Sequence, residues 1–344
     1  MLLYQGENRK RWVDLGKGLS ILLVILFHCE QYLPLVDTGT SRIFSFFLMP
    51  FFFFLSGYMF TSDYRNFSIR RKAKQILRSI VWTYLVFTTI ICIPKAISNG
   101  NSVGTGFMEI LLGLASWFVV SLGLAQVFLS LVLWRTKNLW HLFLSSIACV
   151  LAGLAIRSVY DGLLPYYLDC ALFAELFLML GFLYRIYEPR FERFVNVWTL
   201  LLLLAVYSGL MYVEKNVLLF TTSNVFWLNG IHQFPLFLVY TFCGICMMLV
   251  LVKLLNSHYL SFICYIGANS LIYYYLNGGV VKTWRFIYAK VSADGFLNNW
   301  VGFFLVFLAV VVTLTVIVLA INRFCPILKG SKNSFNRWLP RWKW

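Results

Sequence analysis

Apolar stretches of about 20 residues recur along the whole 344-residue chain. A bilayer core is about 30 Å thick, so a helix needs roughly that many apolar residues to cross it. The composition agrees, because 60% of the residues are hydrophobic and only 12% are charged, whereas a soluble domain is about half apolar. The sequence therefore predicts an all-α, polytopic membrane helical bundle of about ten transmembrane helices, at residues 18–36, 43–61, 78–95, 117–134, 139–156, 168–186, 197–213, 234–255, 260–280 and 299–322.

The positive charge is distributed unevenly between the two sides of this bundle. With the N-terminus in the cytoplasm, 22 of the 29 Lys and Arg residues fall on the cytoplasmic side, as the positive-inside rule requires. Both termini are then cytoplasmic. Membrane topology accounts for the net charge of +16, so we expect membrane lipids as partners and no nucleic acid. The sequence does not indicate an oligomeric state.

The first apolar stretch follows a basic leader, as in a secretory signal peptide. No small-residue cleavage site follows it, so we expect a retained helix. No polar connection is long enough to form a soluble core. The expected organisation is a membrane domain at 1–322 and a basic, Trp-rich cytoplasmic tail at 323–344, which is typical of an interfacial anchor.

The outer connections and the cysteines carry little chemistry. Residues 101–106 have the composition of a flexible loop, and the longest outer connections, such as 95–116, are placed to shape a substrate mouth. All eight cysteines fall in or beside apolar spans, which predicts small core residues. Cys243 and Cys246 have the spacing of a metal pair, but no second pair or histidine accompanies them, so no metal is expected.

Asp14, Lys17 and His28 form a polar stripe on the first span. His28 follows Lys17 by eleven positions, which amounts to three helical turns and about 20°, over about 16 Å. Asp14 precedes Lys17 by one turn and lies on the same face. A histidine at this depth must find a polar partner. It is either a functional group or a packing residue that is hydrogen-bonded to a neighbouring helix.

Glu175 is a second polar group within an apolar span. It lies about 10 Å from the outer surface, against about 14 Å for His28, so the two side chains could meet. A carboxylate beside a histidine would fix its tautomer and stabilise the imidazolium. The alternative is that Glu175 is a structural partner of another helix.

A basic segment precedes the third span. Six Lys and Arg residues lie in the stretch from Arg65 to Arg78, both ends included. They either set the topology and attract anionic lipid headgroups, or they bind a cytosolic polyanion such as a nucleotide or coenzyme A.

Several blocks, in this order, resemble those of the integral-membrane acyltransferase-3 family, and in particular its branch of surface-sugar O-acetyltransferases. The matching elements are Lys17 and His28 at the ends of a basic-X10-His signature with Asp14 before it, Met49–Tyr58 (MPFFFFLSGY), the basic segment leading to Tyr84, Trp117-Phe118 with Leu122, and Gly267–Tyr273. Leu48, Thr83 and Asn277 depart from the family pattern, and His28 is the only family histidine retained.

The resemblance implies transfer of an acetyl or other short acyl group from cytoplasmic acyl-coenzyme A to a hydroxyl of a glycan, a lipid-linked saccharide or a lipid, in a bacterial plasma membrane. His28 would be the general base or the acyl carrier, with Lys17, Asp14 and Glu175 as the other expected catalytic residues. The chain ends about twenty residues after its last span, so we expect acyl delivery to be direct or through a separate partner.

The remaining site residues follow from the same resemblance. Arg71, Lys74 and Arg78 would hold the coenzyme phosphates, and the pantetheine arm would pass Lys17. Ser56 and Asn277 would donate hydrogen bonds to a thioester oxyanion. The expected substrate-binding residues are Ser56, Tyr58, Trp117, Tyr273 and Asn277. The alternative function is a proton-coupled transporter or flippase of a lipid-linked sugar, in which His28 and Glu175 couple protons or bind cargo.

Overall fold

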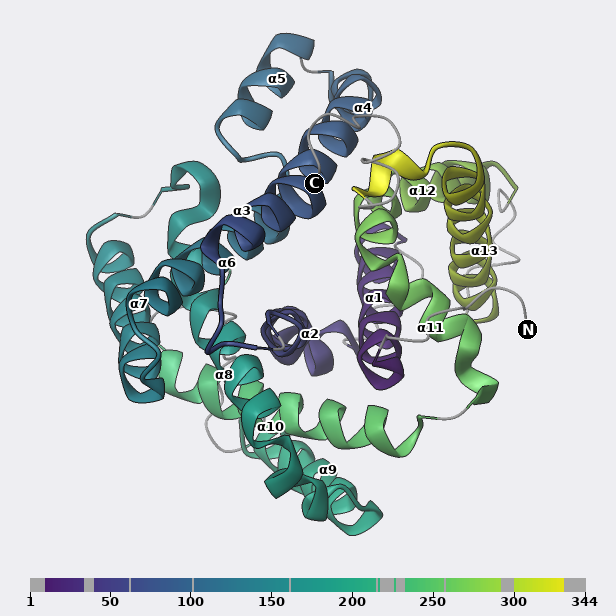
Figure 1. Ribbon diagram of the computed structural model, residues 1–344. Helices are drawn as coiled ribbons and strands as arrows, with labels where there is room; N and C mark the ends of the chain where they lie inside the picture. Colours follow the sequence, from purple (N-terminus) through teal and green to yellow (C-terminus); the bar gives the residue numbers. More distant parts are fainter. Residues whose placement is uncertain are drawn as a thin grey trace. The chain divides into compact units, whose positions relative to one another are not determined.

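The computed structural model describes residues 10–33, 40–61, 63–100, 102–160, 162–214, 216, 226, 233–256, 258–291 and 300–330. These residues form helices and connections without a strand, which confirms the all-α class (Figure 1). The helices are α1 (Arg11–Tyr32), α2 (Thr40–Tyr58), α3 (Ile69–Ile76), η1 (Leu77–Val81), α4 (Trp82–Asn99), α5 (Val103–Leu111), α6 (Trp117–Arg135), α7 (Leu139–Val159), η2 (Pro165–Tyr167), α8 (Leu168–Phe191), η3 (Glu192–Phe194), α9 (Val197–Val213), α10 (Phe234–Leu254), η5 (His258–Leu260), α11 (Ser261–Ala268), α12 (Ser270–Val291), α13 (Trp300–Phe324) and η6 (Pro326–Lys329).

Each of the ten predicted spans falls on a helix, and eight helical segments within the described residues are long and apolar enough to cross a membrane. The other two predicted spans differ from a simple crossing. One falls on α9, which has 17 residues. The other falls on α11 and α12, which are interrupted at Asn269. The Asn269 side chain donates to Tyr265 O at 2.9 Å and so satisfies a carbonyl at the break.

Two helices begin earlier than hydropathy predicts, because polar residues form their first turns. α1 begins at Arg11 rather than at residue 18, so Asp14 and Lys17 lie within the helix. The third span begins at Ile69 rather than at residue 78. Ser68 caps it by accepting a hydrogen bond from the Arg71 backbone N–H. Hydropathy alone placed these turns outside the spans.

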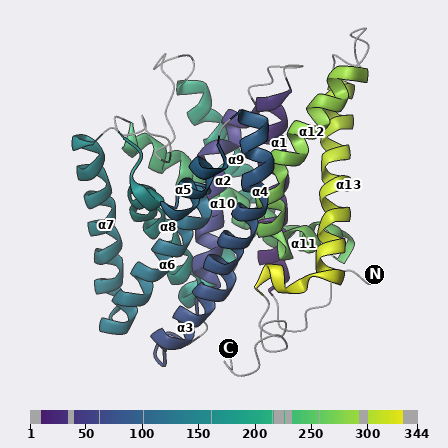
Figure 2. The same cartoon turned by 90° about the horizontal axis from the view of Figure 1, so that it is seen from above.

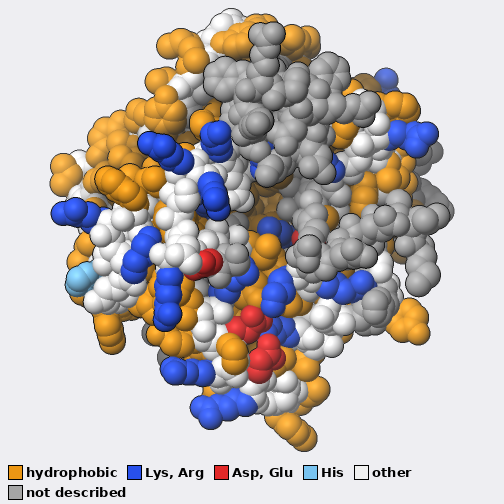
Figure 3. Space-filling model, in the orientation of Figure 1, with side chains coloured by type: hydrophobic (Ala, Val, Ile, Leu, Met, Phe, Trp, Pro, Cys, Tyr) orange, Lys and Arg blue, Asp and Glu red, His pale blue; other side chains and the backbone are white. Residues whose placement is uncertain are grey.

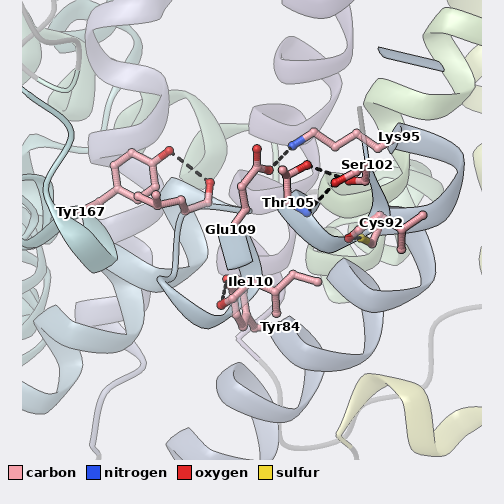
Figure 4. Close-up of polar contacts among 10 residues, drawn as sticks. Tyr84, Cys92, Lys95, Ser102, Thr105, Glu109, Ile110 and Tyr167 are labelled. Carbon is pink, nitrogen blue, oxygen red and sulfur yellow. Dashed lines mark hydrogen bonds and ion pairs between the residues drawn. The ribbon is translucent and has the colours of Figure 1, made fainter. Parts of the chain in front are cut away.

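The prediction of a flexible loop at 101–106 is wrong for residues 103–106, because α5 begins at Val103 and includes Thr105 (Figure 4). The Ser102 side chain caps this helix by accepting from Thr105 N at 3.2 Å. Tyr84 donates to Ile110 O at 2.8 Å, and Lys95 pairs with Glu109 at 2.8 Å, so both contacts hold α5 against α4. A good N-cap and tertiary contacts therefore outweigh the glycines of this stretch.

The chain divides into two compact units. The first unit holds residues 1–52, 193–219 and 240–324, and the second holds residues 53–192, 220–239 and 325–344. α2 and α10 contribute to both units. The predicted boundary at residue 322 stays a prediction, and the tail from residue 331 lies outside the described residues.

In the first unit, α1 packs against α11 and α12, and α12 packs against α13 (Figures 1 and 2). Two glycines bring the α1 and α11 backbones together. A Cβ at Gly18 would lie 2.1 Å from Ile263 O, and one at Gly267 would lie 1.8 Å from Asp14 O. Only glycine fits at either position, so this crossing fixes the start of the α1 stripe.

In the second unit, α8 packs against α6 and α7 (Figure 2), and it meets the end of α2 through another glycine pair. A Cβ at Gly57 would lie 1.8 Å from Leu178 O, and one at Gly181 would lie 1.8 Å from Phe54 O. The end of the MPFFFFLSGY block is thus fixed directly on α8. Small residues allow such close backbone approach in membrane helices.

Candidate active site

The polar stripe predicted for α1 lies on one continuous helix. α1 runs unbroken from Arg11 to Tyr32, so Asp14, Lys17 and His28 keep the spacing that places them on one face. Asp14 is buried, whereas Lys17 and His28 are half-buried. The two half-buried groups remain accessible to a bound molecule.

The first turns of α1 are fixed on α11. Arg11 donates to Ser261 Oγ at 3.0 Å, and the Cys264 thiol approaches Arg11 O at 3.9 Å. Together with the Gly267 contact at the Asp14 carbonyl, these interactions position the turn that carries Asp14 and Lys17.

His28 lies among aromatic rings near the other end of α1. Its imidazole is stacked on Tyr32 with ring centroids 6.0 Å apart, and it meets Phe27 edge to face at 5.5 Å. The Gln31 side chain approaches the ring. Nδ1 is nevertheless buried, and no described residue meets hydrogen-bond geometry with it. An imidazole nitrogen in this state can accept a proton or an acyl group from a bound substrate.

Two of the predicted substrate-binding residues lie on α12 of the same unit. Tyr273 is fully buried, and its hydroxyl donates to Thr315 Oγ1 at 2.9 Å, which joins α12 to α13. Asn277 is buried and donates one amide hydrogen to Tyr274 O at 2.7 Å. Tyr273 thus has a packing role, while Asn277 has a second amide hydrogen available.

The predicted phosphate-binding residues lie on α3 and η1 in the second unit. Arg71 and Lys74 are exposed, and Lys and Arg side chains gather on the face of the molecule over α3 (Figures 1 and 3). Arg78 is half-buried on the π-helical turn η1, and its buried Nε has no hydrogen-bond partner among the described residues. π-helical turns occur frequently at functional sites.

Lys72, within the same basic segment, has a different role. Its side chain is buried, and Nζ donates to Phe60 O at 3.1 Å and lies 3.9 Å from the centroid of the Phe60 ring. Lys72 therefore fixes the connection between α2 and α3. In that connection, hydrogen bonds from the Asn66 side chain and backbone hold the pKa of Asp63 below its usual value.

A contact that the sequence did not predict lies beside Arg78. The C-terminal segment η6 packs against α4, where Trp82 Nε1 donates to Ile327 O at 3.0 Å. Gly330 follows with a φ of +67°, and a Cβ there would lie 2.1 Å from Arg78 O. Both the backbone conformation and the available space therefore require glycine at this position.

The three remaining substrate-binding candidates, Ser56, Tyr58 and Trp117, lie in the second unit. Ser56 and Trp117 are half-buried. Tyr58 is fully buried, and its hydroxyl donates to Glu188 Oε2 at 2.6 Å. Trp117 contacts the Phe226 ring, with the two ring centroids 5.6 Å apart. Tyr58 therefore connects α2 to α8, while Trp117 belongs to an aromatic cluster.

Glu175 is the most unusual acid of the second unit. Its side chain is 1% exposed, and neither carboxylate oxygen has a hydrogen-bond partner among the described residues. A buried polar group without a partner is costly, and an ionisable residue within a membrane span is a candidate functional residue. The proposed pairing with His28 joins residues of two units and stays a prediction.

A buried ion pair that was not predicted from the sequence lies in the second unit. Arg157 Nε donates to Asp169 Oδ2 at 2.7 Å, and both side chains are at most 5% exposed. The guanidinium also lies 5.0 Å from the centroid of the Phe173 ring. The pair joins α7 to α8 across their short connection. Opposite charges at the facing ends of two consecutive apolar spans were the signal that could have predicted it.

A family model described as an acyltransferase domain, Acyl_transf_3, matches residues 10–320, a range that includes every predicted site residue. No curated protein and no solved structure matches the chain.

Proposed function

Because the chain belongs to the acyltransferase-3 family, we propose that this multi-pass membrane acyltransferase moves an acetyl or other short acyl group from cytoplasmic acyl-coenzyme A to a hydroxyl of a cell-surface or lipid-linked saccharide. We place it in a bacterial plasma membrane. The observation that carries the proposal is the stripe on α1, with a half-buried lysine three turns from a histidine whose Nδ1 has no partner among the described residues.

The donor is assigned to coenzyme A from the charge of α3 and η1. Coenzyme A carries several phosphates, and arginine and lysine side chains are the usual phosphate ligands. Arg71 and Lys74 are exposed, and the buried Nε of Arg78 has no described partner, so all three can accept an anion. Lys17 would interact with the pantetheine arm on its way toward His28.

In the general-base route, His28 takes the proton from the acceptor hydroxyl as its oxygen attacks the thioester carbonyl. The tetrahedral oxyanion then collapses, the carbon–sulfur bond breaks, and the thiolate leaves and takes the proton from the imidazolium. In the carrier route, His28 attacks the thioester carbonyl, the carbon–sulfur bond breaks, and the thiol leaves with the imidazole proton. The acceptor hydroxyl then attacks the acyl-imidazole, the bond from nitrogen to the acyl carbon breaks, and the hydroxyl proton passes to the imidazole. Ser56 and the second amide hydrogen of Asn277 are the proposed donors to the oxyanion.

The test is His28→Ala in the full chain, purified in lipid nanodiscs. We expect loss of coenzyme A release from acetyl-coenzyme A in the presence of a surface-glycan extract, by about 10²- to 10⁴-fold. The matched control is His141→Ala, because His141 lies exposed at the start of α7. Mass spectrometry of surface glycans from cells with and without the protein identifies the acceptor.

Normal glycan acetylation by the folded His28→Ala protein would contradict the role of His28. The transporter alternative predicts sugar movement without any release of coenzyme A. The family match supports acyl transfer, and the two functions are separated by whether the wild-type chain consumes acetyl-coenzyme A.

A further inference from the structure

A cation lies next to the end of α1 that follows His28. Lys282 belongs to α12, which packs against α1, and its Nζ lies 5.5 Å from the centroid of the Tyr32 ring. The same Tyr32 ring is stacked on His28 at 6.0 Å, with an interplanar angle of 17°. These two distances place the Lys282 ammonium no more than about 12 Å from the His28 ring.

Lys282 lacks a protein counter-ion within the part of the chain that the structure describes. No described carboxylate lies within ion-pair distance of Nζ, and the side chain is half-buried in a predominantly apolar unit. Ionisable residues in membrane helices usually mark a substrate path or pair with an opposite charge. The Tyr32 ring offsets part of the desolvation through a cation–π contact, but it supplies no negative charge.

The position of Lys282 along α1 separates it from the donor path. Lys17 and Tyr32 are fifteen residues apart, so they lie about 22 Å apart along the helix. His28 lies between them, one turn before Tyr32. With the cytoplasmic N-terminus that the charge distribution predicts, Lys17 lies on the donor side of His28 and Lys282 lies on the outer side.

We propose that Tyr32 and Lys282 form the acceptor subsite beside His28, and that it takes an acceptor with a phosphate or carboxylate close to the hydroxyl that is acylated. The inference rests on the proposed function. Lys282 binds the anionic group, and the Tyr32 hydroxyl is the proposed hydrogen-bond partner of the sugar. All three residues are half-buried, so part of each is exposed. A monosaccharide that bears a phosphate can bridge the distance from Lys282 to His28.

The test measures binding rather than turnover. The full chain in phosphatidylcholine nanodiscs is titrated with glucose 1-phosphate and, separately, with neutral methyl glucoside. We expect Lys282→Ala to weaken glucose 1-phosphate binding at least tenfold and to leave methyl glucoside binding unchanged, and Lys282→Arg to restore most of the affinity. The matched control is Lys290→Ala, because Lys290 lies on the same helix, 4.6 Å from the centroid of the Phe286 ring.

Equal glucose 1-phosphate affinity in wild type and Lys282→Ala would overturn the proposal, as would an equal loss in Lys290→Ala. A second arm uses nanodiscs that contain phosphatidylglycerol. Phosphatidylglycerol could abolish glucose 1-phosphate binding to the wild type, while the Lys282→Ala variant retains less of this lipid than the wild type does. In that case the anion is a lipid headgroup, and the acceptor assignment is wrong. Failure of the proposed function has a different readout, namely no coenzyme A release by the wild-type chain.

Discussion

The two glycine-mediated helix crossings share one backbone geometry but carry different polar residues. At the α1–α11 crossing of the first unit and the α2–α8 crossing of the second, an added Cβ would lie 1.8 to 2.1 Å from a carbonyl oxygen. Around the second crossing, polar groups are mostly paired within the protein, as in the hydrogen bond from Tyr58 to Glu188. Along α1, Lys17 and His28 are half-buried and accessible.

This difference shows where a membrane protein can place chemistry. Paired polar groups between helices stabilise the framework, because each buried charge or hydroxyl has its partner. Side chains that react with a substrate must instead keep a hydrogen-bonding position open for it. Among the described residues, Nδ1 of His28 in the first unit is buried without a hydrogen-bond partner, and so are the Glu175 carboxylate, the Arg78 Nε and the Ser116 hydroxyl in the second unit.

The largest effect is expected from breaking the Arg157–Asp169 pair. Arg157→Ala leaves the buried carboxylate of Asp169 without its partner, and such losses cost about 3–5 kcal/mol. We expect a large fall in the thermal unfolding temperature of the detergent-purified protein. The Arg157→Met/Asp169→Leu double variant removes both charges and should recover much of this stability.

The control for this prediction is Lys95→Ala, which breaks the Lys95–Glu109 pair. The distance between nitrogen and oxygen in this pair is 2.8 Å, close to the 2.7 Å of the Arg157–Asp169 pair, but its side chains are 46% and 39% exposed. Exposed pairs contribute about 0–1 kcal/mol. Similar destabilisation by the two single variants would show that burial does not distinguish these pairs.

Glu175→Gln is expected to reduce activity without reducing stability. The carboxyl group has no described hydrogen-bond partner to lose, so the free energy of unfolding should stay within about 1 kcal/mol of the wild type. If Glu175 assists the histidine, transfer should fall about 10²-fold, which corresponds to about 2.7 kcal/mol. Coenzyme A release and thermal unfolding are measured on the same preparation.

The predicted pairing of Glu175 with His28 is tested by a double-mutant cycle. If the two residues act together, adding Glu175→Gln to His28→Ala should cause no further loss of transfer. Full activity of Glu175→Gln would leave Glu175 as a structural residue. Additive losses would show that the two groups act independently.

Much of the fold follows from hydropathy alone, because each predicted span falls on a helix. The errors lie where tertiary contacts decide the structure. Residues 69–77 include four Lys and Arg residues, but the Ser68 cap and the buried Lys72 extend the third span into them. Similarly, α5 forms at a glycine-rich stretch because Tyr84 and Lys95 hold it.

The candidate site was predictable in part. Helical spacing placed Asp14, Lys17 and His28 on one face, and α1 has the continuity that this requires. Spacing cannot show which side chains are already bonded. The structure shows that Tyr58 and Tyr273 use their hydroxyls in helix packing. Contacts between distant segments, such as Lys282 with Tyr32, leave no local signal in the sequence.

The smallest predicted effect concerns the glycine crossing under the α1 stripe. Gly18→Ala inserts a methyl group 2.1 Å from Ile263 O, so α1 and α11 must separate. Overpacking of this kind costs about 1–3 kcal/mol, more than the roughly 1 kcal/mol that alanine gains over glycine within a helix. We expect a net loss of thermal stability, together with reduced transfer, because the turn that carries Lys17 moves.

Gly278→Ala on α12 is the matched control, because no atom lies within 4 Å of its added Cβ. There the helix propensity of alanine acts alone, so stability should stay unchanged or rise by up to about 1 kcal/mol. The two variants add the same atom to helices of the same unit, and they should change stability in opposite directions. If Gly18→Ala is as stable and active as Gly278→Ala, the α1–α11 contact does not position the stripe, and the difference between the two crossings has no functional meaning.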